Sequence, residues 1–305
     1  MKRDIKLIIL YGDIGTTSWK KAQNLIDGVY TCGYRDYAEK FGCIIYMTPQ
    51  KVSKDWEYSM PNPSDVIEFI NQYPEAIVMA IKYAPDRDSQ ILLNVRNKKL
   101  YYSCCNKNMY NSFCDISLVD SEKRLKRNAK LFVKGKDPDF WKPIDVSKEY
   151  DYLLIGRRGD KNESFFLSSL NRIKKDRRIL WIGGYNHRRK IKTRHYVNYT
   201  KPLSKEGVRD NISKAKVGIL FSELGEGFPQ SFLEMTMCGV PVVYNAKAPI
   251  NNIYMQSPYN CLLANRNNLI KKSEILLKTF DKNACRKVSV DNYSMNKFYE
   301  WISNL

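Results

Sequence analysis

Short runs of consecutive apolar residues recur along the chain, and segments with helical spacing separate many of them. The first half has such runs at 7–11, 43–47, 76–81, 99–103 and 116–119, with helices expected over 19–41 and 65–72. The second half has them at 152–155, 179–182, 197–199, 217–221 and 240–244, with helices expected over 204–215, 229–238 and 295–305. Apolar runs this short, without polar alternation, are typical of buried parallel strands. The alternation of strands and helices predicts an α/β protein built on doubly wound parallel sheets.

The stretch 216–244 carries the most chemistry. After its first apolar run comes a polar loop with Glu226, then a helix that opens at Pro229 and ends at Gly239. The first turn of a helix leaves N–H groups without intrahelical acceptors, so the amides of Gln230, Ser231 and Phe232 predict an anion site. A second carboxylate, Glu234, lies within the helix. The spacing of Ser231 and Glu234 also fits a capping box, and both interpretations stay open at this point.

Residues 226–234, EGFPQSFLE, are followed by CGVPVV at 238–243. This arrangement resembles the E-x7-E signature of family-four-type retaining glycosyltransferases, which have the GT-B fold. The resemblance implies two Rossmann-like domains that face each other across a cleft, and a C-terminal helix that crosses back to the first domain. It also implies that Glu226 is catalytic and orients the donor sugar, while Glu234 binds the nucleotide ribose. The other donor-binding residues implied here are Gly227, Phe228, Pro229, Gln230 and Ser231.

A second motif follows the apolar run 152–155. Gly156, Arg157 and Lys161 resemble the family's glycine, arginine and lysine, of which the charged pair grips the donor diphosphate. The spacing is one residue shorter than in the family, so Arg158 is an alternative to Arg157. A charged pair at the end of a strand can neutralise two phosphates. The turn at Gly183 resembles the one that the family places beneath the nucleotide.

Residues 130–143, KLFVKGKDPDFWKP, resemble the family's stretch that ends the first domain. We therefore predict a first domain over 1–146, a nucleotide-sugar domain over 147–290 and a returning helix over 291–305. Asp137 and Asp139 form a D-x-D, as do Asp86 and Asp88, and this pattern binds metal in the other large glycosyltransferase fold. Neither pair follows a strand of a nucleotide-binding unit, so turn chemistry is favoured and no metal ligand is assigned.

The acceptor side is less defined. Gly12, Asp13 and Gly15 lie where the first strand ends, the edge at which parallel sheets bind ligands, although the spacing is no dinucleotide fingerprint and a simple turn fits equally. Family members usually carry a histidine where the strand 99–103 ends. This chain has none there, and Asn106 and Ser103 are the candidate replacements.

Bulk composition restricts the function further. The chain has 305 residues, enough for two domains, and a net charge of +19, which attracts phosphate-rich or acidic partners. Its 8 cysteines form no C-x-x-C pair and it has 2 histidines, so zinc and triad chemistry are poorly supported. No apolar stretch is long enough to span a membrane, and no secretory signal is evident, so a cytoplasmic protein is expected.

The resemblance therefore implies a retaining transferase that uses a nucleotide-diphosphate sugar as substrate, with a UDP-sugar as the expected donor, and that requires no metal or other cofactor. Basic clusters at 123–130, 172–178 and 188–194 favour DNA as the acceptor, with a hydroxymethylated base modified as in some bacteriophages. The cytoplasm would then be that of the host. The alternatives are a transferase of cell-surface or lipid-linked glycans and a non-catalytic nucleic-acid-binding protein on the same scaffold.

Overall fold

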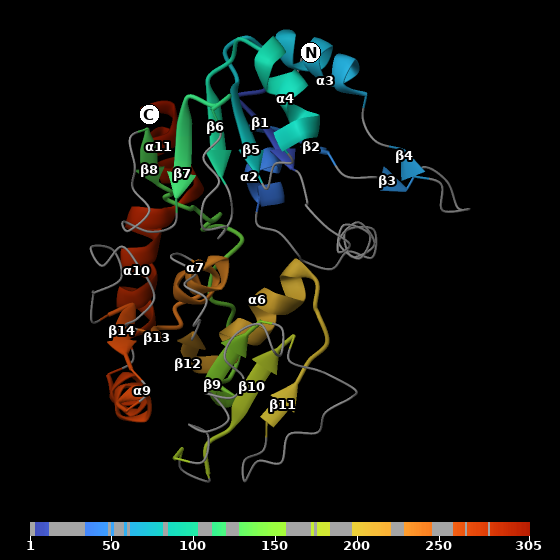
Figure 1. The fold of residues 1–305 in the computed structure, drawn as a ribbon. Coiled ribbons are helices and arrows are strands. Elements are labelled where there is room, and N and C mark those ends of the chain that lie inside the picture. Colours follow the sequence, from blue (N-terminus) through green and yellow to red (C-terminus); the bar gives the residue numbers. More distant parts are fainter. Residues whose placement is uncertain are drawn as a thin grey trace. The chain divides into compact units, whose positions relative to one another are not determined.

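The computed structural model describes residues 4–11, 34–47, 50–51, 58–59, 62–81, 85–102, 112–119, 128–156, 172–173, 176–183, 197–220, 229–245, 259–265, 267–279 and 281–305. The chain divides into two compact units (Figure 1). The first comprises Met1–Phe132 and Trp301–Leu305, and the second comprises Val133–Glu300. The functional domain limits predicted at 146/147 and 290/291 stay a prediction.

The first unit is built on a parallel sheet of six strands in the order β2-β1-β5-β6-β7-β8. The strands are β1 (Leu7–Tyr11), β2 (Gly42–Tyr46), β5 (Ile77–Ile81), β6 (Lys99–Tyr102), β7 (Ile116–Val119) and β8 (Ala129–Leu131). A separate antiparallel pair joins β3 (Gln50–Lys51) and β4 (Tyr58–Ser59). Every residue of β1 and β5 is buried, as their unbroken apolar runs predict for central parallel strands.

Three described helices accompany this sheet: α2 (Tyr34–Phe41), α3 (Pro63–Asn71) and α4 (Pro85–Asn94). The side chain of Asn62 caps α3 by accepting a hydrogen bond from the Ser64 N–H at 3.2 Å. Helices α3 and α4 pack apolar residues such as Ile70 and Ile91 against Ile8 and Val78 of the sheet. The prediction of a loop turn at Asp86 and Asp88 is wrong, because both residues lie in the first helical turn of α4.

The second unit has its own six-stranded parallel sheet, in the order β11-β10-β9-β12-β13-β14. The strands are β9 (Tyr150–Ile155), β10 (Ile179–Ile182), β11 (Val197–Tyr199), β12 (Ala215–Leu220), β13 (Val242–Asn245) and β14 (Cys261–Ala264). Counted along the chain, these strands have the order 3-2-1-4-5-6, which is that of Rossmann dinucleotide-binding domains. The predicted α/β class with two Rossmann-like sheets is confirmed.

The helices of the second unit are α6 (Lys205–Ser213), α7 (Gln230–Met237), α9 (Leu269–Lys278), α10 (Lys282–Tyr293) and most of α11 (Met295–Ser303). Ser204 caps α6, as predicted, because its Oγ accepts a hydrogen bond from the Gly207 N–H. Helix α9 contributes Leu269 and Leu276 to a core formed with Tyr152, Ile179 and other strand residues. The last turn of α11 belongs to the first unit, where Trp301 lies 6.1 Å from Phe132, measured between ring centroids.

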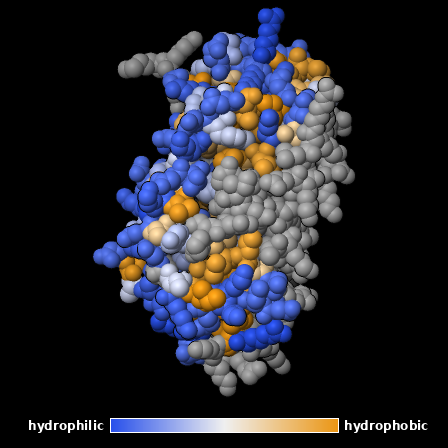
Figure 2. Space-filling model, turned by 90° about the vertical axis from the view of Figure 1, so that its left-hand side faces the viewer, coloured by the Kyte–Doolittle hydropathy of each residue, from blue (hydrophilic) through white to orange (hydrophobic). Residues whose placement is uncertain are grey.

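Most large apolar side chains of the described residues are buried, although Leu93, Val146, Tyr259 and Ile275 are exposed. On the face shown in Figure 2, apolar patches lie beside hydrophilic side chains. Four of the five described cysteines, Cys114, Cys238, Cys261 and Cys285, are buried free thiols, and Cys43 is a half-buried one. Burial raises the pKa of Cys238 to about 12, and the Glu234 charge adds to the shift, so this thiol stays protonated and unreactive near pH 7. Of the helices in the described ranges, none is both long and apolar enough to cross a membrane.

Candidate functional site

The strand order of the second unit places side by side the ends of the two strands that precede the predicted donor loops. Strands β9 and β12 are parallel neighbours, and the connections reverse direction between them. In open parallel sheets, ligands bind outside the carboxyl ends of the strands at such a switch point. The loop with Arg157, Arg158 and Lys161 follows β9, and the loop with Glu226, Gly227 and Phe228 follows β12. These six residues themselves lie outside the described residues.

Gly156 begins the loop that follows β9. Its φ is 141°, a backbone conformation that residues with a side chain rarely adopt, so this position favours glycine. The indole N–H of Trp181 donates to the Gly156 carbonyl at 2.9 Å, and the Gly156 N–H donates to the Ile182 carbonyl at 3.1 Å. The strand end is therefore held rigidly where the predicted phosphate loop departs.

The predicted donor residue Gly183 directly follows β10, the neighbour of β9. Its φ is +77°, and a Cβ built on it would lie 3.5 Å from the Gly156 carbonyl oxygen. The Gly183 N–H donates to the Thr200 hydroxyl at 3.3 Å. The structure thus brings Gly183 next to the entrance of the predicted phosphate loop.

Helix α7 begins one residue later than expected. Pro229 is the N-cap, with φ −70° and ψ 139°, and Gln230 is the first helical residue. No side chain caps this end. The Phe232 N–H donates to the Pro229 carbonyl at 3.1 Å. The prediction that this N–H is available to bind an anion is therefore wrong. The backbone N–H groups of Gln230 and Ser231 still have no intrahelical acceptor, which retains the anion-binding character of a helix start.

The C-terminus of α7 is fixed as the sequence predicts. Gly239 has φ +72° and donates its N–H to the Thr236 carbonyl at 3.0 Å, while the Val240 N–H donates to the Met235 carbonyl at 2.9 Å. This pair of bonds is the Schellman motif, which requires a left-handed residue at the position of Gly239. The end of α7 is therefore set by local sequence.

Glu234 makes a contact that the sequence does not indicate. Its Oε1 lies 2.8 Å from the Nζ of Lys136, a residue 98 positions earlier in the chain. The side chains are 4% and 0% exposed, so the ion pair is buried. Lys136 Nζ also lies 5.2 Å from the centroid of the Trp141 ring, within the range of a cation–π interaction.

The capping-box interpretation of Glu234 is wrong. That motif requires a serine at the N-cap and a glutamate at the third helical position. The N-cap is instead Pro229, and the carboxylate of Glu234 binds Lys136.

The segment that carries Lys136 is itself firmly held. The Lys136 N–H donates to the Tyr293 carbonyl at 2.9 Å, and the Lys136 carbonyl accepts from the Met295 N–H at 2.9 Å. The guanidinium of Arg286 donates to the carbonyls of Pro138, Trp141 and Met237. Arg286 therefore ties this segment to the end of α7, the same helix that carries Glu234.

Gln230 also stands out at the start of α7. Both polar atoms of its side-chain amide are buried, and neither has a hydrogen-bond partner in the part of the chain that the structure describes. Gln230 and Glu234 are four residues apart, so they lie on the same face of the helix. This face presents an amide and a carboxylate near the switch point.

The D-x-D at Asp137 and Asp139 forms a turn, as predicted. The Asp139 N–H donates to the Asp137 side chain at 3.0 Å, and the Trp141 N–H donates to the Asp137 carbonyl. The described residues contain no group of three or more side chains arranged to hold a metal ion.

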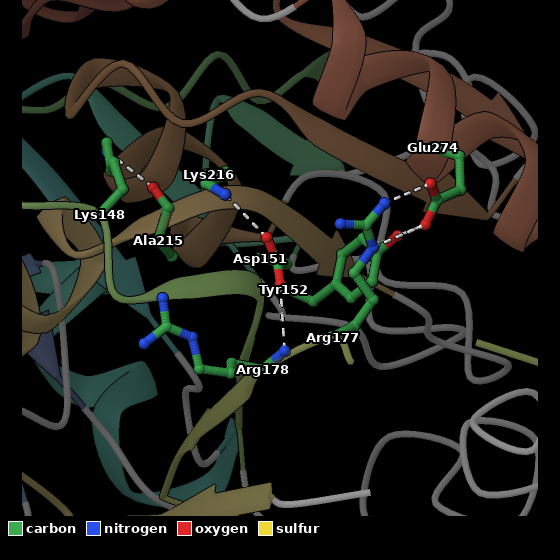
Figure 3. A network of polar contacts seen from close by, with 8 residues as sticks. All are labelled: Lys148, Asp151, Tyr152, Arg177, Arg178, Ala215, Lys216 and Glu274. Atoms are coloured by element: carbon green, nitrogen blue, oxygen red, sulfur yellow. Dashed lines mark hydrogen bonds and ion pairs between the residues drawn. The ribbon is translucent and has the colours of Figure 1, made fainter. Parts of the chain in front are cut away.

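A larger polar network lies at the opposite, amino-terminal edge of the second sheet (Figure 3). Asp151 accepts hydrogen bonds from Lys216 at 2.8 Å and from the Arg178 N–H at 3.1 Å. Glu274 accepts from Arg177 through both oxygens and from the Tyr152 hydroxyl at 2.7 Å.

The charged groups of this network form ion pairs with one another. Burial alone would raise the pKa of Asp151, but the hydrogen bonds from Lys216 and Arg178 and the nearby positive charges bring it below its usual value. Burial and the contact with Glu274 raise the pKa of Tyr152. Because ligand sites of parallel sheets form at the other edge, we interpret this network as structural.

The acceptor-side candidates Gly12, Asp13, Gly15 and Asn106 all lie outside the described residues. The segment that contains the first three leaves the carboxyl end of β1. This strand lies between β2 and β5, where the order β2-β1-β5 places the switch point of the first sheet.

Comparison with known proteins agrees with this geometry. Residues 149–278, most of the second unit, match the family described as "Glycosyl transferases group 1". The second unit resembles a glycosyltransferase domain. The predicted enzyme class agrees with this match. No curated protein sequence matches the chain.

Solved glycosyltransferase structures share the fold of the chain. The Anabaena protein HepE, in complex with UDP and glucose, aligns with a TM-score of 0.61 at 12% identity and covers 98% of both chains. A glycosyltransferase from Rickettsia africae aligns with a TM-score of 0.65 at 14% identity, over 98% of this chain and 97% of that one. An alpha-glucosyltransferase in complex with UDP and a 13-mer DNA aligns with a TM-score of 0.63 at 11% identity, over 97% and 98%. These likenesses confirm the predicted GT-B fold.

Proposed function

We propose that the protein is a retaining glycosyltransferase that moves a sugar from a nucleotide-diphosphate sugar, most simply a UDP-sugar, to an acceptor hydroxyl. One observation carries the proposal. The β9 and β12 loops, with their arginines, lysine and glutamate, leave neighbouring strand ends at the switch point of a sheet that matches a glycosyltransferase family. The likeness to a protein solved with UDP and glucose supports the choice of donor.

In the proposed reaction the acceptor oxygen forms a bond to the anomeric carbon of the sugar as the bond to the diphosphate breaks. Negative charge grows on the leaving phosphate, which takes up the proton of the acceptor. Fixed positive potential stabilises this charge most effectively. Arg157 or Arg158, Lys161 and the amides that begin α7 supply such potential, so the proposed site requires no metal.

The remaining assignments follow the resemblance to the glycosyltransferase family. Glu226 orients the donor sugar and Glu234 holds the ribose. Gly227, Phe228, Pro229 and Gly183 shape the backbone around the nucleotide. The loop with Gly12, Asp13 and Gly15, together with Asn106, receives the acceptor.

For the acceptor we propose DNA that carries a hydroxymethylated base, modified in the cytoplasm, as a bacteriophage enzyme would act in its host. The net charge of +19 favours a polyanionic partner, and the fold is shared with an alpha-glucosyltransferase solved with DNA. In the basic cluster at 172–178, Arg177 already forms an ion pair with Glu274. The clusters at 123–130 and 188–194 would therefore supply most of the phosphate contacts.

The test incubates the protein with UDP-glucose, UDP-galactose, UDP-N-acetylglucosamine and GDP-mannose, and follows donor hydrolysis. Each reaction is repeated with hydroxymethylated DNA and with unmodified DNA of the same sequence. We expect hydrolysis of one donor and sugar transfer only to the hydroxymethylated DNA. Hydrolysis without transfer to either DNA would contradict the DNA acceptor and favour a glycan or lipid-linked acceptor. DNA binding without turnover of any donor would contradict the enzyme and favour a non-catalytic binding protein.

A further inference from the structure

The buried pair of Lys136 and Glu234 is difficult to explain by stability alone. Removing two charges from water is costly, and a well-packed apolar pair often replaces a buried ion pair without loss. Most residues around α7 are apolar and fully buried, including Phe232, Leu233 and Met235. An apolar pair at positions 136 and 234 would therefore suit the local environment.

The position of the pair points to a ligand. Glu234 lies one turn beyond Gln230, on the same face of α7, and the buried amide of Gln230 has no partner among the described residues. That face belongs to a helix that starts at the switch point, where nucleotides bind in sheets of this order. A carboxylate and an amide on one helix face are suited to the hydroxyl groups of a ribose.

We propose that Lys136 is a positioning residue for the donor: its buried ammonium holds the Glu234 carboxylate in the orientation that binds the ribose hydroxyls. The inference rests on the proposed function, because it requires a nucleotide at α7. Lys136 is 0% exposed, so it acts through Glu234 and does not contact the donor itself.

The surroundings of Lys136 make it a fixed anchor. Its backbone N–H and carbonyl are both hydrogen-bonded, to Tyr293 and Met295. Gly135 next to it is packed so closely that a Cβ would lie 2.7 Å from the Cβ of Phe298. A carboxylate held by such an anchor loses little further side-chain freedom when a ligand binds, and this preorganisation favours binding.

The test compares the binding of UDP with that of 2′,3′-dideoxyuridine diphosphate, which lacks both ribose hydroxyls, by isothermal titration calorimetry. The ratio of the two dissociation constants reports ribose recognition, and it is insensitive to the fraction of protein that is folded. We expect a ratio of about tenfold or more in the wild type, the effect of a hydrogen bond to a charged group. Lys136→Met should bring the ratio close to one.

A matched control comes from the network at the opposite sheet edge. Lys216→Met removes an ammonium that also binds a carboxylate at 2.8 Å, and it should leave the ratio unchanged. A folded Lys136→Met variant with the wild-type ratio would overturn the inference, and so would an equal fall in Lys216→Met.

A second comparison uses variants in which residue 234 carries no negative charge. If Lys136 acts only through Glu234, the variants Glu234→Gln and Lys136→Met/Glu234→Gln should bind UDP equally, within about twofold. A much weaker double variant would show that Lys136 acts independently of Glu234 and would overturn the inference. A wild-type protein that binds no UDP and hydrolyses no donor would instead overturn the proposed function.

Discussion

The stability of the buried ion pair can be predicted from its surroundings. Lys136→Met removes the ammonium that pairs with the carboxylate of Glu234, a residue 3% exposed, and keeps a side chain of similar length. Loss of one partner of a buried pair typically costs about 3–5 kcal/mol. Loss of the cation–π contact with Trp141 adds about 0.5–2 kcal/mol. Since domains are stable by only about 5–15 kcal/mol, we expect a large effect on unfolding.

The assay is urea and thermal unfolding of the wild type, Lys136→Met and Lys136→Met/Glu234→Leu. For a unit of this size, 1 kcal/mol corresponds to about 2–4 °C, so a loss of about 4 kcal/mol lowers the Tm by roughly 8–16 °C. The double variant places two apolar side chains in the same space and should recover most of the lost stability. A single variant within about 1 kcal/mol of the wild type would refute the reasoning, as would a double variant no more stable than the single one.

Three further predictions concern other positions. Gly239→Ala should lower the free energy of unfolding by about 1–3 kcal/mol, because φ is +72° and a Cβ would lie 2.9 Å from the Lys282 carbonyl oxygen. The control is Gly207→Ala in the regular helix α6, which should be neutral or slightly stabilising. Equal urea midpoints for the two variants would contradict the backbone strain expected at position 239. Burial, with the charge of Lys282, lowers the pKa of Lys148 to about 8, below its value in the unfolded chain. The free energy of unfolding of the wild type, relative to that of Lys148→Met, should therefore rise as the pH increases from about 8 toward 10.5. A difference between the two proteins that stays constant over this pH range would refute the lowered pKa. Glu226→Ala should abolish donor hydrolysis and transfer together in a folded protein, and unchanged rates would remove this residue from the site.

Local sequence patterns predicted much of the second unit. The apolar runs at 179–182 and 197–199 match β10 and β11, and Ser204 caps α6 as expected. Gly239 ends α7 through bonds formed within a few residues of the chain. Such features depend on backbone sterics and on hydrogen bonds between near neighbours, so the residues themselves reveal them.

Elements without a clear apolar period were missed. Helix α10 buries Cys285, Ser289 and Tyr293 at four-residue spacing. The serine and the tyrosine are not strongly apolar, so the sequence shows no clear helical pattern of apolar residues. Helix α4 begins with two aspartates that equally suit a turn. In both cases packing against the rest of the unit selects the helix, and that information is not local.

By itself, the sequence determined most of the strands, the start of α6 and the end of α7, and it predicted the two donor loops and the roles of Glu226 and Glu234. Only the tertiary structure decided the strand order that places the carboxyl ends of β9 and β12 at one switch point. It also decided that Glu234 binds Lys136, although the two are 98 positions apart. The physical reason is that side-chain periodicity and capping act over a few residues, whereas strand neighbours and buried charge pairs depend on how distant segments pack.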